Sequence, residues 1–274
     1  MVKTMQVSET NYHSPEANRK YMSYSLYREF LSCEARALAK LDGWEEKPST
    51  ARLVGLYVHA GIEGPEKLLQ FQSEHPEMFR RDGGLKSDFL QAEEMLAAVR
   101  NDPLMMRALT GEHEVIITAE WEGVLWKAKV DVLNEEKGFI TELKTARSLL
   151  HKEWSGTERL YQHFIEHYGY IGQLALYREL DRIANGRKEP LDVFLAIVTK
   201  ESPPNKIVLT FDPKDRLDDE LEKIRRNLPH VMAVKNGEVS PERCENCDYC
   251  RETSRWTQQV WDYDEWYPEI WHRL

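Results

Sequence analysis

The first hundred residues repeat apolar side chains with the period of amphipathic helices. Residues 23–41 place apolar side chains three and four positions apart, and Ser23 stands where a helix N-cap is favoured. Similar periodicity predicts helices over residues 50–61 and 88–101, with a further helix and loop over residues 62–83. We therefore expect this part of the chain to be mainly helical.

The pattern then changes to short runs of β-branched and aromatic side chains, which are typical of strands. Three such runs, separated by turn signals, are HEVIITAEWEG, VLWKAKVDVLN and GFITELKTA. They predict a three-strand meander, because each turn between them is short. Two later runs, LDVFLAIVTK and KIVLTFD, predict two more strands on either side of the turn ESPPN.

Further helices complete the predicted order of elements. A loop that contains Trp154 leads into a long helix at about residues 157–184, and another helix is expected over residues 214–235. This order predicts an α/β fold with a central mixed β-sheet flanked by helices. We expect a single domain over residues 1–253, followed by a Trp-rich acidic tail over residues 254–274.

Composition narrows the class of protein. A hydrophobic content of 41% is enough to build a full core, and the chain has no apolar run of about eighteen residues that could span a membrane. The N-terminus lacks the basic and apolar regions of a secretory signal, so we expect a soluble, cytoplasmic protein. The net charge of −10 argues against binding nucleic acid over the whole surface. It leaves room for a local basic groove, or for an acidic site that holds cations.

Charged residues interrupt two of the apolar strands. Glu142 and Lys144 are two positions apart, so they point to the same face of their strand. A hairpin turn would bring Asp131 of the preceding strand beside Glu142. A surface salt bridge is one interpretation, and such pairs contribute only about 0–1 kcal/mol. A hard divalent cation is the other, because it offsets the cost of burying two carboxylates.

Two helices carry further candidate residues. Gln173 and Tyr177 are four positions apart on one helix face, directly after the strand of Glu142. Taken alone, they could be a hydrogen-bonded core amide and its packing neighbour. His59 lies on an earlier helix, where a histidine often only packs, although neutral imidazole also suits Mn²⁺ beside carboxylates.

In this order, the residues resemble the PD-(D/E)xK nuclease superfamily. They are more closely similar to its RecB-like branch, which includes phage recombination exonucleases and exodeoxyribonuclease VIII. The stretches MSYSLYREFLSCEARALAKLDG and LAIVTKESPPNKIVLTF also look like phage exonucleases of that kind, and the resemblance runs from about residue 20 to residue 253. The proline of the superfamily's name is replaced here by Val130.

The resemblance implies a restriction-endonuclease-like fold and metal-dependent hydrolysis of DNA. It implies that Mg²⁺ or Mn²⁺ is held by Asp131, Glu142 and His59 together with the carbonyl of Leu143. Lys144 would then activate the attacking water. The resemblance gives Gln173 and Tyr177 the role of positioning the phosphate backbone.

The same resemblance implies a biological context. The expected enzyme degrades double-stranded DNA from 5′ to 3′ and leaves a 3′ overhang for a single-strand annealing protein, in the host cytoplasm if the chain is phage-encoded. A homo-oligomer would suit such an exonuclease. The alternative is a non-catalytic DNA- or partner-binding module, stabilised by a metal cluster, whose acidic site is vestigial. For DNA contacts we favour Lys127 and Lys129, which share a strand face with Asp131, and Arg147.

All four cysteines of the chain are candidate metal ligands: Cys33, Cys244, Cys247 and Cys250. Three ligands at short spacing plus a remote fourth suit a [4Fe–4S] cluster, with a structural Zn²⁺ as the alternative. Cys33 could instead be a buried thiol on the apolar face of its helix. Iron–sulfur members of the resembled branch end in a C-x2-C-x5-C triplet, whereas this chain has C-x2-C-x2-C.

The tail carries four tryptophans at intervals of five residues, which fits neither a helix face nor a strand face: Trp256, Trp261, Trp266 and Trp271. We expect these side chains to clasp the body of the domain. A docking strip for another subunit or an annealing protein is the alternative, because aromatic side chains are favoured as interface anchors.

Overall fold

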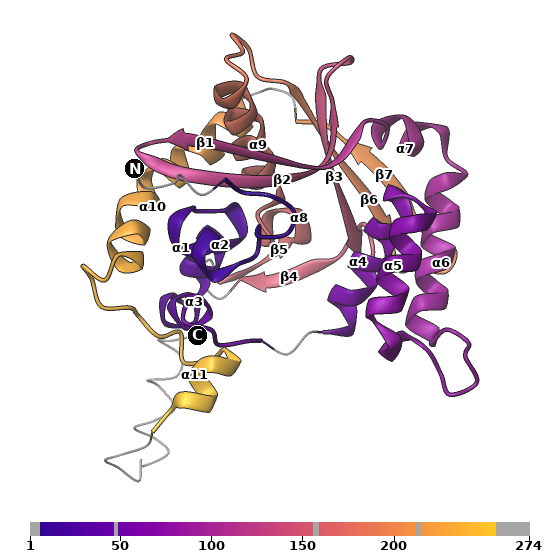
Figure 1. Cartoon of the computed structure of the whole chain (residues 1–274), viewed down its shortest axis with the longest axis horizontal. Helices are drawn as coiled ribbons and strands as arrows, with labels where there is room; N and C mark the ends of the chain where they lie inside the picture. The colour runs from indigo at the N-terminus through magenta and orange to yellow at the C-terminus, as the bar shows by residue number, and fades with distance from the viewer. Residues whose placement is uncertain (1–5, 47–48, 156–158, 212–214, 256–274) are drawn as a thin grey trace. The chain divides into compact units, whose positions relative to one another are not determined.

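The computed structural model describes residues 6–46, 49–155, 159–211 and 215–255 (Figure 1). Where the sequence predicted one domain over residues 1–253, these residues group into two compact units made of alternating segments. The sheet unit comprises residues 47–151 and 170–221, and the cysteine unit comprises the remaining segments. The predicted features of the Trp-rich tail from Trp256 onwards lie outside the described residues.

A five-stranded sheet forms the centre of the sheet unit, in the strand order β1-β2-β3-β6-β7. Neighbouring strands pair antiparallel, except for β3 and β6, which are parallel. The strands are β1 (Glu112–Trp121), β2 (Val124–Asn134), β3 (Phe139–Ala146), β6 (Asp192–Thr199) and β7 (Lys206–Leu209). The predicted meander and the mixed sheet of the α/β class are confirmed.

Tight turns fix the register of the meander. Glu122 and Gly123 join β1 to β2 and both have positive φ angles, of 51° and 72°, as a two-residue turn matched to strand twist requires. The second turn closes where the carbonyl of Asn134 accepts a hydrogen bond from the N–H of Gly138 at 2.9 Å. The register therefore follows from local turn chemistry, as the sequence indicated.

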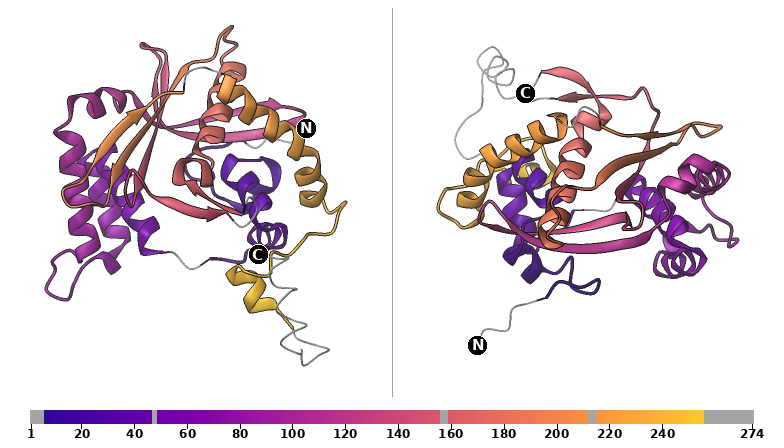
Figure 2. Two further views of the ribbon diagram at one scale, coloured as in Figure 1. Left: turned by 180° about the vertical axis from the view of Figure 1, so that it is seen from behind. Right: turned by 90° about the horizontal axis from the view of Figure 1, so that it is seen from above.

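Helices cover both faces of this sheet. Leu143 faces a core shared with α4 and α6, whereas its neighbour Glu142 points to the opposite face and meets Gln173 of α9. Figures 1 and 2 show α4, α5 and α6 grouped beside β6 and β7. The helices are α4 (Thr50–Glu63), α5 (Pro65–Glu74), α6 (Ser87–Arg100), α7 (Pro103–Ala108) and α9 (Tyr170–Ala184).

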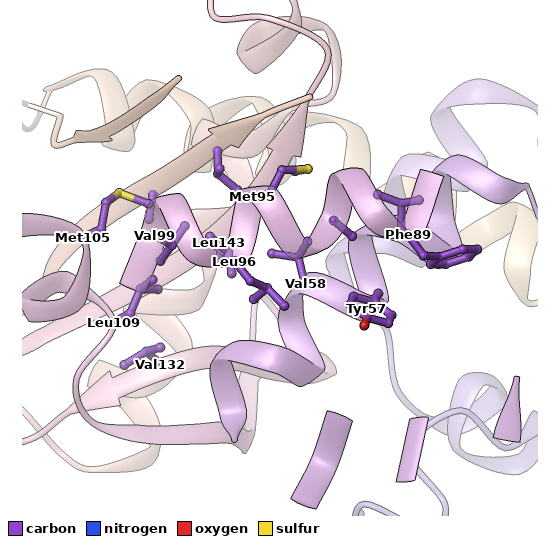
Figure 3. Close-up of a cluster of buried hydrophobic side chains, with 14 of the residues drawn as sticks. Tyr57, Val58, Phe89, Met95, Leu96, Val99, Met105, Leu109, Val132 and Leu143 are labelled. Atoms are coloured by element: carbon purple, nitrogen blue, oxygen red, sulfur yellow. The ribbon is translucent and has the colours of Figure 1, made fainter. Parts of the chain in front are cut away.

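The core between α4 and α6 explains the helical periodicity of these segments. Figure 3 shows Met95, Leu96 and Val99 of α6 lying among the side chains of Val58 and Leu143. These positions recur three and four apart, and all of them are at most 1% exposed. The helices are held by this burial, since a side chain of this size gains about 1.5–3 kcal/mol when it leaves water.

The cysteine unit joins segments that are distant in the sequence. Tyr24 donates a hydrogen bond from its hydroxyl to the carbonyl of Gly169 at 2.7 Å, and Lys235 donates to the carbonyl of Tyr21 at 3.1 Å. Its elements are α1 (Pro15–Lys20), α2 (Tyr24–Ser32), α3 (Glu34–Leu41), β4 (Lys152–Ser155), β5 (Leu160–His163), α8 (Phe164–His167), α11 (Asp248–Thr253) and most of α10 (Asp215–Lys235). Figure 1 shows α3 and α11, from opposite ends of the sequence, next to each other.

Three predictions of local structure were wrong. The helix over residues 23–41 breaks at Cys33, whose extended backbone (φ −164°, ψ 106°) separates α2 from α3. Trp154 lies on strand β4, which pairs with β5, and not in a loop. The helix predicted from residue 157 begins only at Tyr170, because the chain first forms β5 and α8 and then turns at Gly169 (φ 71°). Across the described ranges, no helix is both long and apolar enough to cross a membrane.

A glycine in α4 sets how closely α4 and α6 approach. A Cβ added at Gly61 would stand 2.5 Å from Cδ1 of Leu96, which is fully buried. We expect Gly61→Ala to lower the free energy of unfolding by about 1–3 kcal/mol through overpacking. Gly55→Ala in the same helix is the matched control, because its Cβ would meet only Thr145 at 3.4 Å. Urea denaturation of both variants measures this, and equal stabilities would contradict the packing described.

Candidate active site and cysteine centre

The β2–β3 ladder ends where the acidic residues begin. Only three residue pairs form this ladder, of which Val132 and Thr141 are the last before the strands separate. The N–H of Leu143 is therefore free of β2 and donates a hydrogen bond to Oδ2 of Asp131 at 2.7 Å. The carbonyl of a strand residue points to the same edge as its N–H, so the carbonyl of Leu143 also faces this gap.

Glu142 is the centre of a polar cluster on the opposite face of β3. Its Oε1 accepts hydrogen bonds from Nζ of Lys144 at 2.7 Å and from Nε2 of Gln173 at 2.6 Å. The same Gln173 nitrogen also lies 3.0 Å from the hydroxyl of Tyr177. Glu142 is only 3% exposed, and its Oε2 has no hydrogen-bond partner among the described residues. One buried carboxylate oxygen is thus satisfied twice and the other is left without a partner.

Lys144 has a second neighbour that the sequence did not indicate. Its Nζ lies 4.9 Å from the centroid of the Tyr170 ring, close enough for a cation–π contact. Tyr170 begins α9, the helix that also carries Gln173. The aromatic ring therefore limits where the ammonium can move, while Glu142 fixes its direction. Tyr170 could have been found as the residue three positions before Gln173, on the same helix face.

His59 reaches the acidic site from α4. Its Nδ1 lies 3.5 Å from Oδ1 of Asp131. Burial lowers the pKa of His59, but the charge of Asp131 outweighs this effect and leaves the pKa raised. Burial in turn raises the pKa of Asp131, and the charge of His59 reverses that effect, so the carboxyl stays ionised to lower pH than usual. The pair stabilises the ionised aspartate that a cation would need.

The pKa of Glu142 is raised, whereas that of Asp131 is lowered. Burial, followed by the nearby charge of Asp131, raises its pKa to about 7, although Lys144 partly offsets this increase. Burial alone would lower the pKa of Lys144, but Glu142 and Asp131 raise it above its ordinary value. At neutral pH the cluster therefore holds a protonated amine beside a carboxyl that is only partly ionised.

Glu114 on β1 is a candidate ligand that the sequence analysis missed. One ligand atom each from His59, Glu114 and Asp131 lie within 4.8 Å of one another, and such a group could hold a metal ion. Glu114 has a φ of 54° in the middle of a strand, an unusual conformation for a residue with a side chain. The β1–β2 register pairs His113 with Val132 and Val115 with Val130, so Glu114 lies at the level of Asp131.

A small pocket opens beside this group. Its lining combines four apolar residues with His59, Glu63, His113, Glu114 and Asp131. Burial, and then the charge of Glu114, raises the pKa of Glu63. A concentration of acidic groups around one cavity favours a cation over an anion there.

The three basic residues that were predicted to contact DNA differ in their exposure to solvent. Lys127 is buried, with 1% of its surface exposed, so its prediction as a phosphate contact was wrong. The alternation that put Lys127 on the face of Asp131 could not show that this face is covered there. Lys129 forms an ion pair with Glu114, and Arg147 is exposed directly after β3. Contact of Lys129 and Arg147 with DNA stays a prediction.

The four cysteines converge within the cysteine unit. Cys33 stands between α2 and α3, while the other three surround the start of α11, and all four are free thiols. The Sγ atom of Cys33 lies 3.6 Å from that of Cys250 and 3.8 Å from that of Cys247. Cys244 lies 3.9 Å from Cys250. Cys33 is a buried thiol, 3% exposed, and it lies beside the other three cysteines.

Comparison with known proteins agrees with this geometry. Residues 23–253 match the model of a family described as a PDDEXK-like domain of unknown function (DUF3799). A crystal structure from Eubacterium rectale, described as that of a candidate exonuclease, superposes with a TM-score of 0.87. Its sequence is 36% identical, and the match covers 95% of this chain and 98% of that one.

Other comparisons are less informative. The crystal structure of SSO0001 is 17% identical over 82% of this chain and 91% of that one, but its TM-score of 0.28 is too low to support an argument. No curated protein matches the sequence. The family match over most of the chain and the superposition over 95% of it carry the assignment. The chain belongs to the PDDEXK-like family, and with it to the PD-(D/E)xK nuclease superfamily.

Proposed function

We propose that this protein is a divalent-metal-dependent nuclease that hydrolyses phosphodiester bonds of DNA. The observation that carries the proposal is the buried carboxylate of Glu142, which is 3% exposed and feels the charge of Asp131. One of its oxygens has no hydrogen-bond partner in the part of the chain that the structure describes. A buried carboxylate in this state is costly unless a cation coordinates it. A structural salt bridge would instead leave both oxygens satisfied or exposed.

The residues present fit a hard cation. Asp131, Glu142 and the carbonyl of Leu143 would hold Mg²⁺ or Mn²⁺ through oxygen, and His59 would add a nitrogen ligand that suits Mn²⁺. Glu114 of β1 would add a further oxygen ligand, because it offers a ligand atom within 4.8 Å of those of His59 and Asp131. When bound, the cation would polarise the phosphate and lower the pKa of an attacking water.

Lys144 is suited to stabilise charge and not to remove a proton. Its neighbours raise its pKa, so the amine stays protonated near neutral pH. A protonated amine can donate hydrogen bonds to the attacking water and to the phosphate oxygen on which charge develops. Glu142 and the ring of Tyr170 hold the ammonium in one place, which limits the loss of side-chain entropy on binding.

Gln173 acts as a positioning residue. It donates to Glu142 and lies beside the hydroxyl of Tyr177, so α9 fixes which oxygen of Glu142 is occupied by protein. The other oxygen then remains for the cation. Tyr177 is largely buried, and its hydroxyl supports Gln173.

The finer features of the activity rest on resemblance. Attack from DNA ends is supported by the description of the Eubacterium rectale neighbour as a candidate exonuclease. The 5′ to 3′ direction, the preference for double strands and a single-strand annealing partner follow from the phage exonucleases that the sequence resembles. DNA labelled separately at the 5′ and 3′ ends, digested as linear and as closed circles, distinguishes these features.

Replacing Lys144 tests the catalytic assignment. We expect Lys144→Ala to reduce cleavage of linear DNA in Mg²⁺ or Mn²⁺ by about 10²- to 10³-fold, because charge on the phosphate would lose its donor. Lys137→Ala is the matched control, since this lysine is exposed in the turn between β2 and β3, the strand that carries Lys144. Equal digestion by Lys144→Ala and the parent protein would reject this catalytic assignment, and no digestion by the parent protein would favour a non-catalytic binding module.

The raised pKa of Glu142 predicts a pH-dependent loss of stability without metal. Its ordinary pKa of 4.5 rises to about 7 in the folded state, so the fold favours the protonated carboxyl. The stabilisation that this gives is present below pH 4.5 and is lost as the pH rises to about 7. The loss is about 3 kcal/mol, at about 1.4 kcal/mol per pKa unit.

Glu142→Gln removes this titration and so provides the measurement. In chelator, the free energy of unfolding of the parent protein should fall relative to Glu142→Gln between pH 5 and pH 8. Adding Mg²⁺ at pH 8 should restore stability to the parent but not to the variant, because only the parent binds the ion tightly. A difference between the two proteins that stays constant with pH would contradict the environment described for Glu142.

A further inference from the structure

We propose that the four cysteines hold one structural zinc ion, and not the iron–sulfur cluster that the sequence resemblance implies. The site is separate from the acidic residues of the sheet unit, so this inference does not depend on the nuclease activity. It rests on the distances between the sulfur atoms, on the hydrogen bonds that they accept and on the presence of four protein ligands.

The sulfur atoms are spaced for a single metal ion. The distances between Sγ atoms are 3.6 Å for Cys33 and Cys250, 3.8 Å for Cys247 and Cys33, and 3.9 Å for Cys244 and Cys250. Zinc binds thiolates at about 2.3 Å with tetrahedral angles, which places neighbouring sulfurs about 3.8 Å apart. The three distances agree with this value.

An iron–sulfur cube does not fit between the same atoms. In a [4Fe–4S] cluster each thiolate binds a different iron at the corner of a cube, so cysteine sulfurs stand about 6 Å apart. Here all four sulfurs lie within 4.8 Å of one another. The backbone would have to open on several sides to admit four irons and four sulfides. The C-x2-C-x2-C spacing also occurs in ferredoxin-type clusters, so the distances between the sulfurs, and not the spacing in the sequence, exclude the cube.

Disulfide bonds do not account for the cluster either. A disulfide joins its sulfurs at about 2.05 Å, whereas the shortest separation measured here is 3.6 Å, and all four cysteines are free. Four sulfurs that share one small volume, none of them bonded to another, need a common partner. A soft divalent ion is the partner that four thiolates select.

The surrounding backbone supports thiolates in this arrangement. The N–H of Cys247 donates to Sγ of Cys244 at 3.3 Å, and the N–H of Cys250 donates to Sγ of Cys247 at 3.4 Å. Glu245 adopts a positive φ of 59°, which turns the chain so that the amide can face the sulfur. Such hydrogen bonds orient metal ligands and stabilise their negative charge.

The four protein ligands define a structural role. Zinc is four-coordinate in structural sites, so no position is left for water or substrate. The site joins Cys33 to cysteines that lie more than two hundred residues later in the sequence. Two nearby contacts link the same two parts of the chain. The N–H of Ala35 donates to the carbonyl of Glu242 at 3.0 Å, and the rings of Trp44 and Tyr249 meet edge to face at 5.6 Å.

Metal analysis of the intact protein tests the proposal. The full chain, purified without oxygen so that a labile cluster would survive, is measured for zinc, iron and acid-labile sulfide. Cys247→Ser is measured in parallel, with Lys144→Ala as the control because it alters only the acidic site. As a second measurement that needs no variant, cobalt is exchanged into the parent protein and its visible spectrum recorded.

We expect one zinc per chain in the parent and in Lys144→Ala, with little iron and no sulfide. Zinc content should fall at least about tenfold in Cys247→Ser, and cobalt should give the intense thiolate charge-transfer bands of a tetrahedral four-sulfur site. About four irons with sulfide, a single iron, or protein without bound metal would each overturn the proposal. Because Lys144→Ala keeps its zinc while losing DNA cleavage, failure of one assignment is distinguishable from failure of the other.

Discussion

Burial of the Glu142 carboxylate is the constraint on which the acidic site depends. Taking this group out of water raises its pKa to about 7, and the nearby Asp131 adds to the effect. Lys144 and Gln173 both donate hydrogen bonds to one oxygen of Glu142, and the second oxygen has no donor among the residues that the structure describes. The fold thus keeps an electrostatic imbalance that protein groups alone do not relieve. A cation bound there would remove a cost that is already present in the folded chain.

The alternation of side chains along a strand predicts part of this arrangement. It does not predict contacts that depend on how strands and helices pack together. Strand alternation placed Glu142 and Lys144 on one face, and the structure brings them to 2.7 Å. The same alternation put Lys127 on the face of Asp131, but no periodicity shows whether another element covers that position, and Lys127 is buried. Glu114 was missed because its proximity depends on the exact register of a hairpin and on a backbone angle that glutamate rarely adopts.

For the cysteines too, the sequence identifies the candidate residues but not the distances between their sulfur atoms. The sequence shows how many thiols are present and which of them are neighbours, and both zinc and an iron–sulfur cluster are compatible with that count. Only distances between the sulfurs distinguish one metal ion from a cluster of four. Cys33 also contradicts its helical periodicity: it breaks the helix that was predicted to contain it, and the break points its sulfur towards the triplet. The break in the predicted helix thus coincides with the position of the remote fourth cysteine.

The early end of the β2–β3 ladder has a consequence for how sequence can vary at this site. Where the strands part, Leu143 turns its amide towards Asp131, and its carbonyl faces the same way. These groups belong to the main chain, so every amino acid except proline would present both of them. The type of residue at position 143 is therefore constrained only by the packing of its side chain against α4 and α6. Any exchange of one apolar residue for another of similar volume would leave these two backbone groups facing the gap.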